Sequence, residues 1–168
     1  MAASNFSCGC RMATWGPLLW RLLHGAAEHL GKPRPVLMQT DEVNRWIFVL
    51  KSVENAMPCA LCRGHYKEWL LRSPVSQFTT LRGTVLRERA RKWLYDLHEN
   101  VNVGKSVVSG ITIEQMPEMY GSLKGYQEAV DKFIAITKDS IQYGHVKADG
   151  LWQFRNNLHY LRKIADMI

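Results

Sequence analysis

The stretch MPCALCRGHY, residues 57–66, decides how the rest of the chain is interpreted, because it places two cysteines one helical turn apart. Pro58 favours a helix start, since its fixed φ suits the first turn and its missing N–H is not needed there. Cys59 and Cys62 would then lie where unpaired N–H groups and the positive end of the helix dipole stabilise a thiolate. A thiolate is the form that attacks disulfides, so the stretch predicts a redox-active dithiol.

Two other interpretations of this cysteine pair stay open at this point. Cys59, Cys62 and His65 offer three zinc ligands, but a structural zinc site needs four and no second ligand pair follows. Two buried thiols without any chemistry are also compatible with the spacing. Arg63 and His65 add positive charge beside the cysteines, which favours the redox interpretation.

Length and composition indicate one globular domain, with room for an extension. The chain has 168 residues, of which 46% are hydrophobic and 22% charged, and these are ordinary proportions for a globular protein. No apolar run reaches the length of a membrane span, and residues 1–11 lack the hydrophobic core of a secretion signal. We therefore expect no transmembrane segment, no signal peptide and no membrane partner.

The charge is strongly basic, at +7 with a pI near 9.4, which raises the question of a nucleic-acid partner. The densest basic run, residues 82–92, alternates with Leu86 and Ala90 at helical spacing. Its charges therefore belong to a solvated helix face. We expect a generally basic surface and no nucleic-acid partner.

The first residues of the chain carry the other two cysteines, in the sequence Cys8-Gly9-Cys10. Residues 1–13 show no periodicity, and we interpret them as a flexible arm. A disulfide across one intervening residue would close a strained and easily reduced ring, which suits a carrier of oxidising equivalents. Two incidental free thiols would explain the same sequence.

Apolar residues at helical spacing predict the first helices. The first helix starts at a Thr14 N-cap and ends before Gly31. The second starts at a Thr40 cap and runs to the dithiol. The helix of the dithiol itself stops before Pro74.

On two of the predicted helices, aromatic and polar residues form a second stripe beside the apolar one. Trp20 and His24 are four residues apart and share a face, as either a ligand site or a core tryptophan beside a hydrogen-bonded histidine would. A helix at about residues 84–102 carries, beside its apolar stripe, a second stripe of Arg91, Tyr95, His98 and Asn102. This mixture suits a groove for a polar aromatic ligand, and an exposed helix face is an equally good explanation.

Two further helices are predicted, at about residues 126–142 and 149–166, after a weakly patterned segment. In the second of them, apolar residues alternate at spacings of three and four: Leu151, Phe154, Leu158, Leu161, Ala165 and Ile168. Such a seam packs on another helix, of this chain or of a partner.

Four motifs stand in order over residues 15–102: Trp15-Gly16-Pro17 with Trp20 and His24; Trp46; Pro58-Cys59-x-x-Cys62-Arg63-x-His65-Tyr66; and Trp93-Leu94-x-x-Leu97-His98-x-Asn100-Val101-Asn102. The Cys-x-x-Cys alone is a weak signal, but the motifs on either side of it make the set specific. Together they resemble the Erv/ALR family of FAD-dependent sulfhydryl oxidases. The form of the cysteine motif is similar to that of the members from large DNA viruses.

The resemblance implies an all-α fold: a four-helix bundle of the Erv/ALR type with a short fifth helix, here followed by additional C-terminal helices. It implies FAD as cofactor and no metal. Cys62 would be the thiol that attacks the flavin, and Cys59 the thiol that exchanges with substrate. The positions that would contact FAD are Gly16, Trp20, His24, His65, His98, Asn102 and Lys105.

The resemblance divides the chain into an arm (1–13), an FAD-binding oxidase bundle (14–109) and a C-terminal helical extension (110–168). The sequence departs from the family pattern after Asn102, where Val103-Gly104-Lys105-Ser106 follows, and it lacks the second structural cysteine pair that often clips the fifth helix. FAD retention could therefore be weaker, unless the C-terminal part replaces the clip.

These residues predict an enzyme, a thiol oxidase that forms disulfides in protein dithiols and passes electrons through FAD to oxygen, giving hydrogen peroxide. The resemblance implies a homodimer, a protein dithiol substrate such as a small thioredoxin-like carrier, and a place in the host cytoplasm or the virion. Cys8 and Cys10 are shuttle candidates on the strength of the flexible arm and the easily reduced ring, since the shuttle pairs of the family differ in spacing and location. A flavin-free binding protein on the same scaffold and a basic helical nucleic-acid binder are the alternatives, and either would be colourless when purified.

Overall fold

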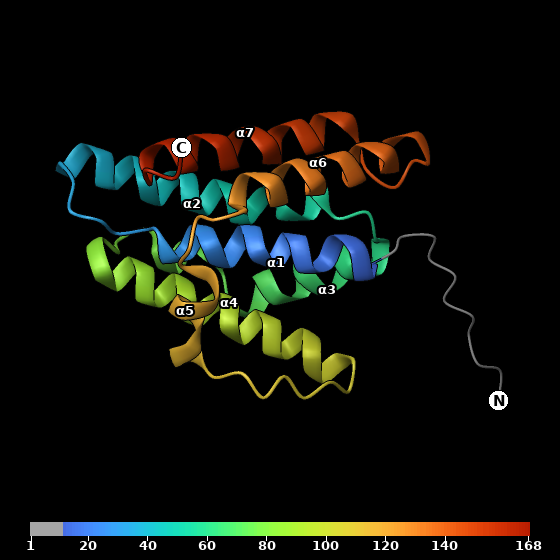
Figure 1. The fold of residues 1–168 in the computed structure, drawn as a ribbon, viewed down its shortest axis with the longest axis horizontal. Helices are drawn as coiled ribbons and strands as arrows, with labels where there is room; N and C mark the ends of the chain where they lie inside the picture. Colours follow the sequence, from blue (N-terminus) through green and yellow to red (C-terminus); the bar gives the residue numbers. More distant parts are fainter. Residues whose placement is uncertain (1–11) are drawn as a thin grey trace.

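The fold is a bundle of helices, described by a computed structural model over residues 12–168 (Figure 1). These residues form seven α-helices and two short 3₁₀ helices, with no strand among them, so the predicted all-α class is confirmed. The α-helices are α1 (Met12–Glu28), α2 (Val36–Ala56), α3 (Ala60–Arg72), α4 (Gly83–Gly104), α5 (Met116–Tyr120), α6 (Tyr126–Gln142) and α7 (Ala148–Ile164). The 3₁₀ helices are η1 (Val75–Phe78) and η2 (Ile113–Gln115).

Two helix starts differ from the prediction. α1 already includes Met12, so Thr14 lies inside the helix and is not its cap, and the expected arm of residues 1–13 overlaps the helix. α2 begins directly after Pro35, ahead of Thr40. The Thr40 hydroxyl donates to the Val36 carbonyl one turn back, as a threonine does inside a helix, because Pro35 already defines the start.

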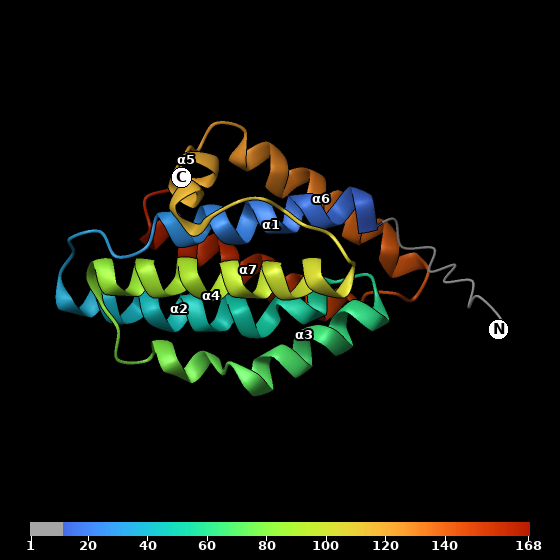
Figure 2. The same ribbon diagram turned by 90° about the horizontal axis from the view of Figure 1, so that it is seen from below.

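The four-helix bundle of the prediction is made by α1, α2, α3 and α4 (Figure 2). α4 packs along α1, and the buried side chains of α1, α2 and α4 share one core, which includes the fully buried rings of Trp46 and Phe78. α3 is anchored mainly by Tyr66, its one fully buried residue, whose hydroxyl donates to the Leu50 carbonyl of α2 at 2.7 Å. The dithiol helix is therefore fixed to α2 at its middle.

The C-terminal helices pack on the bundle, α6 against α1 and α7 against α2. The predicted seam of α7 is buried from Leu151 to Leu161, and Phe133 of α6 meets Phe154 of α7 edge to face, with ring centroids 5.8 Å apart. The seam therefore packs within this chain. Ile168, which the spacing assigned to the seam, is 60% exposed because the helix has ended at Ile164.

Polar contacts hold the ends of these C-terminal helices to the bundle. The Tyr126 hydroxyl at the start of α6 donates to the buried Leu22 carbonyl of α1 at 2.7 Å. Beyond the end of α7, the Lys32 ammonium donates to the Ala165 carbonyl at 2.7 Å. Residues 110–168 thus share the core of the bundle, and the division of the chain at residue 109 stays a prediction. No helix in the described part of the chain is long and apolar enough to cross a membrane.

Candidate active site

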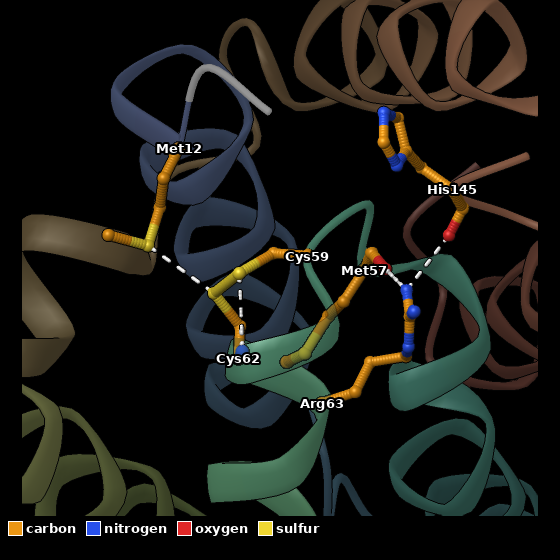
Figure 3. The surroundings of a disulfide bond; sticks show 6 residues. All are labelled: Met12, Met57, Cys59, Cys62, Arg63 and His145. Carbon is orange, nitrogen blue, oxygen red and sulfur yellow. Dashed lines mark hydrogen bonds between the residues drawn. A yellow bond between two sulfur atoms is a disulfide. The ribbon is translucent and has the colours of Figure 1, made fainter. Parts of the chain in front are cut away.

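The cysteine pair forms a disulfide at the first turn of α3 (Figure 3). Cys59 is the N-cap, in an extended backbone conformation, and its Sγ accepts a hydrogen bond from the Cys62 N–H at 3.2 Å. The predicted placement of the cysteines at a helix start is confirmed. Pro58 precedes the cap and does not occupy the first helical position, so its effect is to force the extended entry into the turn.

This placement has a direct chemical consequence for the sulfur of Cys59. After reduction, a thiolate at the N-cap would receive the Cys62 N–H and the positive end of the α3 dipole, which together lower the cost of the negative charge. The side chain of Cys59 is only 7% exposed, and Cys62 is partly buried. As the disulfide stands, its Cys62 end is the more accessible one.

The neighbours of the disulfide come from α1 and from α3 itself. The thioether Sδ of Met12 lies 3.6 Å from the Sγ of Cys62 (Figure 3). The Arg63 guanidinium, expected to add positive charge to the sulfurs, instead donates to the carbonyl oxygens of Met57 and His145. His65 is exposed on α3.

Aromatic and imidazole rings from α1 and α4 meet in a second cluster, as the two polar stripes suggested. The rings of Trp20 and His98 are stacked, with centroids 3.9 Å apart and 10° between planes. His24 lies 5.6 Å from His98 and 5.7 Å from Trp20. We call Trp20, His24, His98 and Tyr120 the ring cluster.

Tyr120 is the member that sequence reasoning missed. It ends α5 and stacks on His24 with centroids 4.5 Å apart. Its segment lacks an apolar period, yet the sequence Thr112-x-x-Gln115 before Met116 forms a capping box, which is a known signal for a helix start. That signal could have predicted the short helix, although not its position on His24.

His24 is buried in an unusual state, since neither of its ring nitrogens has a hydrogen-bond partner. Burial, and then the neighbouring His98, lower the pKa of His24 from 6.5 to about 3, so the ring is neutral. Burial also lowers the pKa of His98. Unpaired ring nitrogens beside flat aromatic faces are the groups that would receive a ring system with polar edges, so these residues fit a flavin nucleotide.

The other expected contact residues lie along the same two helices with separate contacts. Asn102 is one turn beyond His98 and donates to the Glu99 carboxylate at 3.0 Å. Lys105 is exposed at the end of α4, and Gly16 lies one turn before Trp20 on α1. Their roles toward a cofactor stay predictions.

The remaining two members of the second stripe serve the fold. Arg91 makes a two-pronged ion pair with Glu28 of α1, at 2.6 and 2.7 Å. The Tyr95 hydroxyl donates to the Ile111 carbonyl at 3.0 Å. Of the four stripe positions, His98 alone belongs to the ring cluster.

Comparison with known proteins agrees with this arrangement. A family model described as the Erv1 / Alr family matches residues 17–109. Two curated relatives, both named FAD-linked sulfhydryl oxidase, come from a Kenyan pig isolate and a Malawian tick isolate of African swine fever virus. Each is 27% identical over 143 residues, covering 84% of this chain and 98% of the relative, so the expected similarity to viral members is confirmed.

No solved structure matches the chain. The family match nevertheless covers more than half of the sequence, and it includes both cysteines of the disulfide and three of the four members of the ring cluster. The chain belongs to the Erv1/Alr family.

Proposed function

We propose that this chain is an FAD-dependent sulfhydryl oxidase that forms disulfides in protein dithiols. The observation that carries the proposal is the Cys59–Cys62 disulfide at the start of α3, in a chain whose relatives are named FAD-linked sulfhydryl oxidase. Cys62 lies in the first turn of α3, where the positive end of the helix dipole favours the thiolate that must leave when Cys59 is attacked. The ring cluster, in which His24 is buried and Trp20, His98 and Tyr120 are half-buried, supports a cofactor site between α1 and α4.

The thiol chemistry of the chain balances as a two-electron exchange. A substrate thiolate attacks the Sγ of Cys59, the bond between the cysteine sulfurs breaks, and Cys62 leaves as a thiolate. A second substrate thiolate then attacks the mixed disulfide, which frees Cys59 and releases the substrate as a disulfide. Because Cys59 is only 7% exposed, this order requires the side chains over its sulfur to move when substrate arrives.

The dithiol formed in this way has to be reoxidised. Bound FAD would accept its two electrons and pass them to oxygen, giving hydrogen peroxide. Trp20, His24 and His98 would hold the cofactor through their ring faces and the two free nitrogens of His24. Tyr120 would cover the same site from α5.

The absorption spectrum of the purified protein tests this function. We expect a yellow protein with flavin absorption, which bleaches with dithiothreitol in the absence of oxygen and recovers, with peroxide formation, when air is admitted. A colourless protein that does not take up added FAD would instead support the flavin-free binding protein.

Single cysteine variants test the two thiol roles. Cys62→Ser should abolish both turnover and any long-wavelength thiolate–flavin band, whereas Cys59→Ser should stop turnover and keep that band. Ala60→Ser, an exposed change between the cysteines, is the control and should retain turnover. Oxidase activity at the control level in either cysteine variant would contradict the assignment.

Cys8 and Cys10 lie outside the described residues, but the start of α1 constrains where they can reach. Met12, whose sulfur is 3.6 Å from that of Cys62, is two residues after Cys10, and two extended residues span about 7 Å. We therefore keep the shuttle role for this pair. Cys8→Ser with Cys10→Ser should greatly slow oxidation of a protein dithiol and leave that of dithiothreitol near normal, while two normal rates would exclude a shuttle.

The partners and the location follow the same reasoning. A protein dithiol, such as a small thioredoxin-like carrier, would be the substrate, and oxygen the electron acceptor. A homodimer and a place in the host cytoplasm or the virion complete the proposal, on the strength of the family and its viral relatives. Light scattering on the purified protein would measure the oligomeric state.

A further inference from the structure

Arg63 connects three segments that are far apart in the sequence. Its Nη1 donates to the Met57 carbonyl at 2.6 Å and to the His145 carbonyl at 2.8 Å (Figure 3). Met57 directly follows α2, Arg63 belongs to α3, and His145 lies in the turn between α6 and α7. The proposed thiol chemistry does not involve the C-terminal helices, but Arg63 connects the turn between them to the redox motif.

The first of these contacts acts on the short link that carries Cys59. Residues 57–59 are all that joins α2 to α3, and Arg63 lies one turn beyond Cys59. The Arg63 N–H bonds the Cys59 carbonyl at 3.0 Å, while its guanidinium reaches back to the Met57 carbonyl. Through these two bonds Arg63 contacts both ends of the link, and it thereby holds Cys59 in its N-cap position.

The second contact, with the His145 carbonyl, connects this loop to a turn that is itself well packed. In the α6–α7 turn, the His145 N–H donates to the Ser140 carbonyl at 3.1 Å and Val146 is buried. The start of α7 lies so close to the end of α2 that a Cβ on Gly150 would be 2.9 Å from the Cβ of Asn55. Figures 1 and 2 show the start of α3 and the α6–α7 turn at the same end of the molecule.

We propose that Arg63 is a positioning residue, through which the α6–α7 turn holds the Met57–Cys59 link so that the two sulfurs stay close after reduction. The functional meaning of this inference rests on the proposed oxidase, but the contact and its effect on the cysteine pair do not. In this proposal the α6–α7 turn helps to hold the two cysteines of the redox centre in position.

A tethered link favours the disulfide over the dithiol. In the disulfide the link is already constrained by the bond between the sulfurs, so loss of Arg63 changes its freedom little. In the dithiol the same loss releases the link, and freeing about one residue of backbone corresponds to about a tenfold change in an equilibrium constant. The disulfide should therefore become easier to reduce, with a potential about 30 mV less negative.

The opposite sign would follow from charge alone. If Arg63 acted only by stabilising a thiolate, its removal would make the disulfide harder to reduce and the potential more negative. Arg63→Met removes the donors and the charge, whereas Arg63→Lys keeps the charge but replaces the rigid guanidinium, whose Nη1 meets both carbonyls, by a flexible ammonium. The two variants therefore separate positioning from charge.

The experiment measures the potential of the Cys59–Cys62 couple in full-length protein carrying Cys8→Ser and Cys10→Ser, so that one couple titrates. The protein is equilibrated in mixtures of reduced and oxidised dithiothreitol, and its free thiols are counted by alkylation and mass spectrometry. Arg72→Met, which removes the same charge from the exposed end of α3, is the matched control and should keep the parent potential.

The proposal expects a less negative potential in Arg63→Met, a smaller shift of the same sign in Arg63→Lys, and faster hydrogen exchange at residues 144–147 in both. An unchanged or more negative potential in Arg63→Met overturns it, and so does unchanged exchange in the turn. Circular dichroism establishes that the variants are folded. Neither readout needs bound flavin or oxygen uptake, so a failure of the oxidase proposal would be seen separately, in the spectrum.

Discussion

The neutral state of His24 predicts that this one side chain makes the fold sensitive to acid. Its ring is 1% exposed, lies on Tyr120, and has no hydrogen-bond partner on either nitrogen. A proton on such a ring would be a buried and unpaired charge. His24→Phe keeps a flat ring of similar size on Tyr120 and removes the titrating group.

The size of the effect follows from the pKa of His24, which burial and His98 lower from 6.5 to about 3. Above pH 6.5 the ring is neutral in both the folded and the unfolded chain, and it adds no pH dependence. Between these two values the unfolded chain binds the proton first, so the fold loses stability as the pH falls. At about pH 5 the loss amounts to about 2 kcal/mol.

Urea denaturation of the flavin-free protein, followed by circular dichroism at about pH 7.5 and at about pH 5, measures this loss. Wild type should lose about 2 kcal/mol more between the two conditions than His24→Phe does. Any packing cost of the phenyl ring is the same at both pH values and cancels. Val130→Ala, an apolar truncation in the core, is the control and should follow wild type. An equal loss in wild type and His24→Phe would refute the reasoning.

Three further predictions concern the ring cluster and the helix contacts. Trp20→Ala and His98→Ala should lower the ratio of bound flavin to protein more than they lower helicity. A normal flavin content in both variants would show that these residues have only a structural role. Arg91→Met should lower the free energy of unfolding by about 2 to 3 kcal/mol, because it leaves the buried Glu28 carboxylate unpaired; Glu28→Gln added to it should restore part of the loss in the same urea titration. Leu158→Ala in α7 should cost about 2–5 kcal/mol and lower the melting temperature, whereas a C-terminal pair that folded independently would leave the main transition unchanged.

The helices could be predicted because each of them buries one apolar stripe. α6 and α7 lie at the predicted places, and the seam from Leu151 to Leu161 packs as its spacing indicated. The helix starts at Thr14 and Thr40 were wrong for a local reason. A threonine is favoured at an N-cap but is also tolerated inside a helix, where its hydroxyl can bond the carbonyl one turn back, and at Thr40 the rigid Pro35 decides the start.

The site was predictable only as far as its members repeat at helical spacing. Trp20, His24 and His98 followed from the two helix faces, and the structure brings them together. The stacking of Tyr120 on His24 and the contact of Arg63 with His145 did not, because each joins residues that are 82 or more positions apart in the chain. No local pattern states which distant backbone carbonyl an arginine will reach.

The segment after α4 is held in place by hydrogen bonds, although the resemblance to the family led us to look for a second structural cysteine pair there. The sequence has four cysteines: two in the Cys59–Cys62 disulfide and two ahead of α1. The segment runs back along α1 and α4 to α5 (Figure 2), where hydrogen bonds hold it: Arg21 donates to the Tyr120 carbonyl at 3.0 Å, and His29 bonds the Gly121 carbonyl at 2.8 Å.

These bonds fix Tyr120 over His24 without a thiol. A disulfide clip in an enzyme that exchanges disulfides with dithiols is itself open to reduction by its substrates. A clip made of hydrogen bonds to main-chain carbonyls does not respond to reductant at all. The cover of the ring cluster should therefore stay closed in both redox states of Cys59 and Cys62, and the exchange of electrons need not loosen the proposed cofactor site.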